Sequence, residues 1–127
     1  MTDQELLAIA VQAKENAYAP YSNFRVGAAL LCGDGTVYTG CNIENASYTP
    51  TICAERTALF KAVSEGQRQF VAMAIAGDAT PCSPCGVCRQ VLSEFCQPSF
   101  AVVLQGQEGN PVRYTLEQLL PLQFSLS

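Results

Sequence analysis

Residues 81–90 read Pro-Cys-Ser-Pro-Cys-Gly-Val-Cys-Arg-Gln, and two of these cysteines have the spacing of metal ligands. Residues three apart at the start of a helix share one face, so the sulfurs of Cys85 and Cys88 can reach the same ion. The upstream segment Cys53-Ala54-Glu55-Arg56 offers a third sulfur. Three protein ligands with one open position are typical of catalytic rather than structural zinc. The pairing of these two segments therefore predicts a catalytic zinc site.

The residues beside Cys53 suit the chemistry of such a site. Glu55 is a candidate for moving protons on whatever occupies the open position of the metal, although an acid at a helix start is also favoured by the helix dipole alone. Three thiolates on one Zn²⁺ leave a net negative charge. A cation such as Arg56, with Arg89, would offset that charge and restore the power of the metal to acidify water. The alternative for Arg56 is an ordinary surface arginine.

Composition restricts the class of protein. The chain has 127 residues, of which 49% are hydrophobic and 14% charged, and this indicates one compact domain spanning residues 1–127. The net charge of −4 and the scattered basic residues argue against binding a nucleic acid polymer. A small-molecule ligand fits this composition better.

Histidine is absent from the sequence, which excludes Ser-His-Asp and Cys-His catalysis and every metal site that contains histidine. The seven cysteines are an odd number, and the N-terminal residues lack the basic start of a secretory signal. We therefore expect free thiols and metal binding in a cytoplasmic protein, and no membrane span is predicted. Cys32, Cys41 and Cys96 are expected to be small buried hydrophobes.

Hydrophobic periodicity and turn residues predict the secondary structure. The expected elements are, in chain order, a helix over 3–17, strands over 24–31 and 36–43, a helix that starts at 49–51 and ends at Gly66, a strand over 70–76, a helix over 85–96, strands over 100–104 and 112–115, and a short helix over 116–120. The Asp34-Gly35 pair favours a tight hairpin. The connection over 105–111 is too short for a crossover, so the last two strands should be antiparallel neighbours.

This order of elements predicts an α/β fold in which a five-stranded mixed sheet is covered by helices. If both crossovers are right-handed, the helices that start at 49–51 and at 85 lie side by side, with their N-termini together. Cys53, Cys85 and Cys88 would then meet where two helix dipoles favour thiolate over thiol. Topology and spacing thus predict the same metal site.

Cys82 leaves two other metal sites open. Cys82, Cys85 and Cys88 also fit the start of a bacterial ferredoxin run, but that run should continue with a cysteine followed by proline, where this chain has Leu92 and Ser93. A closed structural zinc site that uses Cys82 as the fourth ligand is the other alternative.

Asn42 and Glu44 alternate with Ile43 near the carboxyl end of the second strand. Their side chains should therefore project from the same side of that strand, close to the predicted metal site. They are candidates for ligand binding, and a solvated strand end is the alternative.

Four blocks of the sequence together resemble the small homotetrameric cytidine deaminases. They are Tyr21-Ser-Asn-Phe-Arg-Val-Gly-Ala-Ala-Leu, Cys41-Asn-Ile-Glu-Asn-Ala-Ser-Tyr, Cys53-Ala-Glu-Arg-Thr-Ala and Pro84-Cys-Gly-Val-Cys-Arg-Gln. The resemblance extends over nearly the whole chain, in the variant of the pattern where cysteine replaces the usual histidine ligand. It implies a three-layer α/β/α fold and zinc-dependent hydrolytic deamination of cytidine and deoxycytidine to uridine and deoxyuridine, with release of ammonia, in pyrimidine salvage.

The resemblance also implies roles for individual residues. The ligands of one Zn²⁺ per chain would be Cys53, Cys85 and Cys88. Glu55 would carry protons between water and the base, with Arg56 beside the metal. Substrate binding would fall to Phe24 against the pyrimidine, Asn42 and Glu44 on the ribose hydroxyls, and the backbone around Ala54 on the base. In a homotetramer, a neighbouring subunit would complete each site with Ala46, Tyr48 and Phe124.

Three other functions remain as alternatives. A related deaminase could act on another aminopyrimidine such as blasticidin S, but that resemblance lacks the match over residues 42–48. A polynucleotide deaminase is disfavoured by the acidic net charge. From a different class, the chain could be a structural zinc or iron–sulfur module, which would be inert toward nucleosides.

Overall fold

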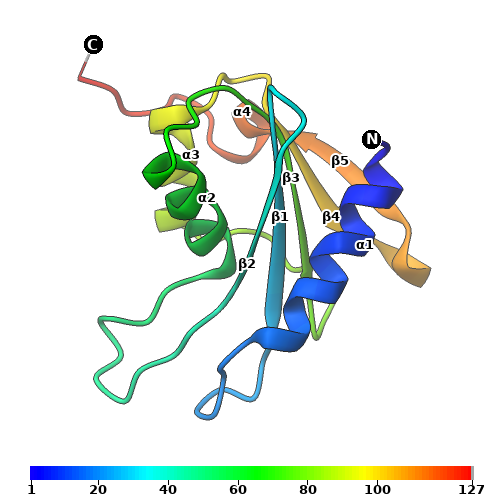
Figure 1. The fold of residues 1–127 in the computed structure, drawn as a ribbon, viewed down its shortest axis with the longest axis vertical. Coiled ribbons are helices and arrows are strands. Elements are labelled where there is room, and N and C mark those ends of the chain that lie inside the picture. Colours follow the sequence, from blue (N-terminus) through cyan, green and yellow to red (C-terminus); the bar gives the residue numbers. More distant parts are fainter. Residues whose placement is uncertain (127) are drawn as a thin grey trace.

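The computed structural model describes residues 1–126 and shows three layers, with helices on both faces of a central sheet (Figure 1). The strands are β1 (Val26–Cys32), β2 (Val37–Cys41), β3 (Phe70–Gly77), β4 (Ala101–Gln105) and β5 (Pro111–Thr115). The helices are α1 (Asp3–Ala13), α2 (Ala54–Ser64), α3 (Gly86–Phe95) and α4 (Leu116–Leu119), with short 3₁₀ turns η1 (Lys14–Asn16) and η2 (Gln107–Gly109). None of the helices within residues 1–126 has the length and apolar character needed to cross a membrane.

The sheet is mixed and has five strands in the order β2-β1-β3-β4-β5. β1 is antiparallel to both β2 and β3, β3 is parallel to β4, and β4 is antiparallel to β5. The predicted five-stranded mixed sheet and the antiparallel pairing of its last two strands are confirmed. Because β2 and β3 run in the same direction, the segments that follow them leave the sheet at the same end.

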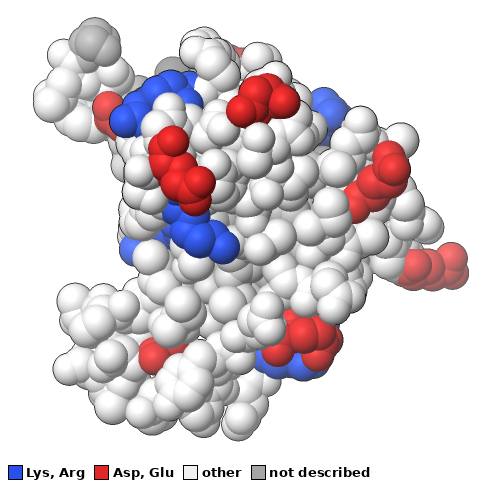
Figure 2. Space-filling model, viewed as in Figure 1, with Lys and Arg blue, Asp and Glu red and all other residues white. Residues whose placement is uncertain are grey.

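The two faces of the sheet carry separate cores. On one face, Leu30 and Ile75 pack with Leu59 of α2 and Leu92 of α3. On the other face, the neighbouring strand residues pack against α1, through Leu6 and other apolar residues. α2 and α3 therefore lie together on one face, as topology predicts, and α1 covers the other face alone (Figure 1). On the surface seen in Figure 2, acidic and basic side chains are interspersed.

The first helix is shorter than predicted. The sequence favours a helix to Ala17, but α1 ends at Ala13 and the chain tightens into the 3₁₀ turn η1. Such turns are common at helix ends, where the last carbonyl groups lack ordinary helical partners. At the other end, the side chains and backbones of Thr2 and Glu5 cap one another, which fixes the start of α1.

The predicted start of the second helix at 49–51 is wrong, because α2 begins at Ala54. Ile43 and Ile52 exchange two backbone hydrogen bonds of 3.0 Å and close the intervening residues into a loop. Tyr48 in this loop has a φ of 64°, which a right-handed helix cannot accommodate. The chain therefore turns back on itself before the helix starts, and Cys53 becomes the N-cap of α2.

α2 approaches β2 very closely at its first turn. A Cβ atom on Gly40 would lie 2.3 Å from the carbonyl oxygen of Ala54 and 2.5 Å from the backbone nitrogen of Ala58. Only a residue without a side chain fits between strand and helix here. This contact places the N-terminus of α2, with Cys53 and Glu55, directly against the sheet.

Candidate active site

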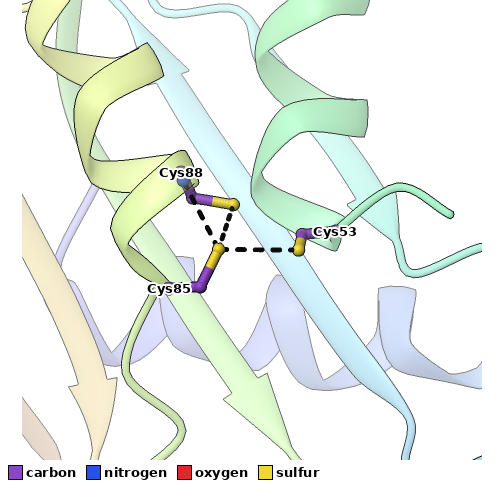
Figure 3. A group of neighbouring side chains, drawn as sticks. All are labelled: Cys53, Cys85 and Cys88. Carbon is purple, nitrogen blue, oxygen red and sulfur yellow. Dashed lines mark hydrogen bonds between the residues drawn. The ribbon is translucent and has the colours of Figure 1, made fainter. Parts of the chain in front are cut away.

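The three predicted cysteines meet at the N-termini of two helices (Figure 3). Cys53 caps α2, Cys85 caps α3, and Cys88 lies in the first turn of α3. The Sγ atoms of Cys53 and Cys85 are 3.9 Å apart, those of Cys85 and Cys88 are 3.5 Å apart, and all three lie within 4.8 Å of one another. Thiolates bound tetrahedrally at Zn–S distances of about 2.3 Å stand roughly 3.8 Å apart. The donor set therefore has the chemistry and the spacing to hold one zinc ion.

Local electrostatics favours the thiolate form at Cys53. The pKa of this thiol is lowered to about 5, chiefly by a hydrogen bond from Cys88 and also by the guanidinium of Arg56. Nη2 of Arg56 lies 3.4 Å from the Sγ atom of Cys53. The two helix N-termini add positive potential at the same place. A metal ligand must be deprotonated, so this environment prepares the site for a cation.

Arg56 is turned inward rather than exposed as a surface arginine. Its Nε atom is buried and has no hydrogen-bond partner among residues 1–126, while Nη2 bonds to Cys53. The strongest cause that raises the pKa of Arg56 is that bond. The guanidinium thus lies in direct contact with the thiolate set whose charge it was expected to offset.

Replacing Arg56 by alanine should lower both zinc retention and the rate of the cytidine deamination that the sequence predicts. Loss of the bond to Cys53 leaves more uncompensated negative charge on the sulfurs, and we expect kcat/KM to fall about tenfold. Zinc content after dialysis and steady-state kinetics check this result. The zinc content and kcat/KM of Arg56→Lys should lie between those of the unmodified chain and of Arg56→Ala, because lysine keeps the charge but not the planar fork. Unchanged zinc content and rate in Arg56→Ala would contradict the assigned role.

Glu55 is a buried carboxyl in the wall of a pocket. It is 5% exposed, and burial is the main cause that raises its pKa. It lies in the first turn of α2, two residues after Cys53. The pocket has a volume of about 200 Å³ and is lined by Val26, Asn42, Thr51, Ile52, Cys53, Ala54, Glu55, Cys82, Ser83 and Cys85. A buried carboxyl and two of the metal-site cysteines therefore line the same cavity.

Asn42 and Glu44 lie just beyond the end of β2 and hold the loop before β1. The amide of Asn42 accepts a hydrogen bond of 2.9 Å from the backbone of Val26 and donates one of 2.9 Å to the carbonyl of Phe24. The carboxylate of Glu44 accepts bonds from the backbones of Tyr21 (2.9 Å) and Ser22 (3.1 Å) and from the Ser22 hydroxyl. The hydroxyl bond is the main cause that lowers the pKa of Glu44.

A second pocket of about 390 Å³ adjoins the first. Its lining residues are Tyr21, Ser22, Glu44, Asn45, Tyr48 and Thr51. Thr51 lines both pockets, so the two volumes are neighbours. Cys53, Cys85 and Glu55 line one volume, and Glu44 lines the other.

The other residues predicted to bind substrate lie at different distances from the pocket that holds Glu55 and the metal-site cysteines. Ala54 is buried and lines the pocket of Glu55, whereas Phe24 is not among the lining residues and its ring lies near Cys82, which is. Tyr48 and Phe124 are 75% and 67% exposed. Among the described residues, the lining of the Glu55 pocket includes neither of these aromatics, nor Ala46, which is also exposed. A single chain thus brings the metal-site sulfurs and the Glu55 carboxyl together; among the described residues, Tyr48 lines the adjoining second pocket, and Ala46 and Phe124 line neither of the two pockets.

The sequence did not predict the way in which Arg89 supports the metal loop. Its Nε atom donates a 2.8 Å bond to the carbonyl of Pro84, which directly precedes Cys85, and Nη1 donates a 2.6 Å bond to the carbonyl of Leu119. Arg89 therefore ties the loop that carries a metal-site cysteine to the end of α4. The two carbonyl groups are distant from one another in the sequence. Every residue type has a backbone carbonyl, so the sequence carries no sign of which ones Arg89 binds.

Arg89→Met should reduce the free energy of unfolding by about 2 kcal/mol, because two partly buried carbonyls would lose a charged donor. Urea unfolding of the zinc-loaded protein measures this change. Arg68→Met is the matched control, since the Arg68 guanidinium also bonds two carbonyls, of Val63 (2.9 Å) and Gln67 (2.8 Å), but at an exposed site. Equal losses of unfolding free energy in the two variants would show that the two bonds of Arg89 stabilise the fold no more than those of an exposed arginine.

Thiolate ligands that share a cavity with a buried carboxyl suit a metal-dependent hydrolase better than a closed structural zinc module. Comparison with known proteins identifies the kind of hydrolase. Residues 1–104 match the cytidine and deoxycytidylate deaminase zinc-binding region, and the chain belongs to this family.

Individual relatives agree with the family. A cytidine deaminase of Sporosarcina psychrophila is 54% identical over 126 residues, which cover 98% of this chain and 93% of that protein. The crystal structure of a cytidine deaminase from Burkholderia pseudomallei superposes with a TM-score of 0.93 at 50% identity, covering 98% of this chain and 100% of the other. A cytidine deaminase structure from Mycobacterium tuberculosis has a TM-score of 0.86 at 39% identity, covering 99% of both chains. The resemblance to cytidine deaminases is confirmed.

Proposed function

We propose that the chain catalyses the zinc-dependent hydrolytic deamination of cytidine and deoxycytidine, which yields uridine or deoxyuridine and ammonia and serves pyrimidine salvage. The observation that carries this proposal is the shared cavity of Cys53, Cys85 and Glu55. The relatives named cytidine deaminase support the choice of nucleoside. The adjoining pocket at Glu44 gives room for the sugar of such a substrate.

The chemistry divides between the metal and Glu55. Cys53, Cys85 and Cys88 would hold the zinc ion, which when bound would supply the Lewis acidity that makes water a nucleophile near neutral pH. Glu55 accepts the proton of this water and delivers protons to N3 of the base and to the departing amine. A carboxyl whose pKa is raised by burial is suited to both directions of transfer, because the best catalytic pKa lies near the working pH. One side chain thus serves first as base and then as acid.

The rim residues suit recognition of a nucleoside. Glu44 already accepts a hydrogen bond from the Ser22 hydroxyl, and a ribose hydroxyl is a donor of the same kind. The carboxylate can therefore bind the sugar with Asn42 beside it. The backbone around Ala54 lines the pocket where the base would lie, with the ring of Phe24 against the pyrimidine.

We also propose that the chain assembles as a homotetramer in which neighbouring subunits complete each site. The exposed aromatics Tyr48 and Phe124 support this assembly, because large apolar side chains at the surface are typical of interfaces. Ala46 lies next to Tyr48 in the same loop and would share its interface. A cytoplasmic location is supported by the seven cysteines, all of which are free.

Ultraviolet absorbance of the purified protein mixed with cytidine, deoxycytidine or blasticidin S tests the proposed function. Loss of the cytidine spectrum, with about one zinc per chain in the same sample, is the expected result. Conversion of blasticidin S alone would support hydrolytic deamination but would contradict cytidine as the substrate. Zinc retention without conversion of any of the three compounds would indicate a structural site. Colour and acid-labile sulfide would instead reveal an iron–sulfur cluster.

A further inference from the structure

We infer that Asp78 is a positioning residue, which fixes Phe24 beside the substrate pocket by binding Arg25. The inference rests on the proposed function and adds to it a residue outside the pocket. Asp78 directly follows β3 and Arg25 directly precedes β1, so the pair continues the antiparallel register beyond Val26 and Gly77. The two residues are 53 positions apart in the sequence.

One carboxylate holds the backbone and the side chain of Arg25 together. The backbone nitrogen of Asp78 donates a 3.1 Å bond to the carbonyl of Arg25. In return, the backbone nitrogen of Arg25 donates a 2.8 Å bond to Oδ2 of Asp78, and its guanidinium adds bonds of 3.2 Å from Nε and 3.1 Å from Nη2. Lys14 supplies a further contact, with Nζ 3.1 Å from Oδ1. The guanidinium fork is the main cause that holds the pKa of Asp78 well below its usual range.

Phe24 directly precedes Arg25 in the chain, so the Asp78–Arg25 pair holds the backbone on one side of it. Its carbonyl accepts the 2.9 Å bond from Asn42, and its backbone nitrogen donates a 3.0 Å bond to the Ser22 hydroxyl. A Cβ atom on Gly77 would lie 3.2 Å from Cε1 of Phe24 and 2.7 Å from Sγ of Cys82. The Phe24 ring therefore lies against the end of β3 and beside Cys82, which lines the cavity.

The pair matters for placement more than for stability. The side chains of Arg25 and Asp78 are 43% and 24% exposed, and ion pairs with such exposure contribute little to stability. The backbone nitrogen of Arg25, however, bonds to the side chain of Asp78, so this carboxylate holds the backbone directly after Phe24, while Asn42 and Ser22 hold Phe24 itself. A ring that must lie flat on a planar base loses contact after a small displacement. Loss of Asp78 should therefore weaken binding while the metal and Glu55 keep their geometry.

Steady-state kinetics with cytidine test the inference. Asp78→Ala should raise KM about tenfold and leave kcat within about twofold, because the lost contact stabilises substrate and transition state alike. Asp78→Asn, which keeps an acceptor for the Arg25 backbone, should give a smaller rise and covers the case in which the alanine variant folds poorly. Zinc content should equal that of the unmodified chain in both variants.

Two other variants serve as controls. Asp3 forms a comparable fork with Arg113, with contacts of 3.0 Å and 3.2 Å, at the opposite end of α1. Asp3→Ala should leave KM unchanged. Lys14→Met removes the second cation from Asp78 and leaves the Arg25 fork intact, so its KM should also stay within about twofold. A rise in KM as large in either control as in Asp78→Ala would overturn the inference.

A double-mutant cycle separates positioning of Phe24 from a general effect on the protein. In a Phe24→Leu background, Asp78→Ala should add little to KM, because the ring that it positions is already gone. Equal rises in both backgrounds would overturn the inference.

Amide hydrogen exchange provides a readout that does not depend on activity. Peptides spanning residues 18–25 should exchange about tenfold faster in Asp78→Ala than in Asp3→Ala. An unmodified chain that fails to deaminate cytidine contradicts the proposed function, and accelerated exchange would still support the structural role of Asp78. An active chain with unchanged KM and unchanged exchange in Asp78→Ala overturns the positioning role alone.

Discussion

Replacing Glu55 by glutamine should lower kcat for cytidine by about ten-thousandfold while the protein keeps its zinc. General acid–base catalysis contributes about 10²–10⁴ to a rate, and a single group that acts in both directions should lie at the upper end of that range. Glutamine has the shape of glutamate but can neither accept the proton of water nor donate one to the amine. Stopped assays over long incubation, with zinc measured in the same samples, would detect the residual rate.

Although Glu55→Gln should lower activity, it should not lower the stability of the fold. Burial raises the pKa of Glu55, so the folded protein opposes ionisation of this carboxyl more than the unfolded chain does. Above the ordinary pKa of glutamate this difference destabilises the fold, and a neutral amide removes it. Glu55→Gln should therefore unfold at an equal or higher temperature. Glu94→Gln, at an exposed position of α3, is the control and should retain full activity. Activity within tenfold of the unmodified chain in Glu55→Gln would exclude Glu55 as the proton carrier.

Cys88→Ala should abolish zinc retention and activity together. Cys88 is fully buried at the start of α3, and the two remaining sulfurs cannot complete a three-ligand site. Because binding of the metal stabilises only the folded state, the variant should also unfold at a lower temperature. Zinc analysis after dialysis and thermal unfolding with and without a chelator measure both effects. The chelator should lower the midpoint of the unmodified chain and leave that of Cys88→Ala unchanged.

The matched control for Cys88 lies at the other end of the same helix. Cys96 is the C-cap of α3, is 8% exposed and packs in the core that α2 and α3 share. Burial raises its pKa to about 12, so it behaves as an apolar thiol. Cys96→Ala should lose about 1 kcal/mol from a small cavity and keep its zinc. Zinc loss in both cysteine variants would point to general unfolding rather than to a ligand.

The metal site could be predicted from sequence because its signals are local. The spacing of Cys85 and Cys88 places two sulfurs on one helix face, and α3 begins within one residue of the predicted start. Alternating and apolar runs likewise predicted the strands, since burial on one or both faces fixes the residue types there. Cys53 could be added to this pair because α2 and α3 follow β2 and β3. These two strands run in the same direction, and the two helices cover the same face of the sheet.

The loops could not be predicted in the same way. Thr49 and Pro50 suit a helix start and a turn equally well, and only the bridge between Ile43 and Ile52 determines which of the two forms. The ion pair of Asp78 with Arg25 joins residues that no local pattern connects. Such contacts depend on the completed topology, and they surround the pocket where the substrate would lie.

The close approach of β2 and α2 at Gly40 has a consequence for the way this protein can evolve or be redesigned. Any side chain at this position would push the start of α2, and with it Cys53 and Glu55, away from the sheet. Libraries aimed at new substrates should therefore keep position 40 constant and vary the exposed loop residues around the second pocket, such as Tyr21 and Asn45. The catalytic framework would then stay fixed while the range of accepted molecules changes.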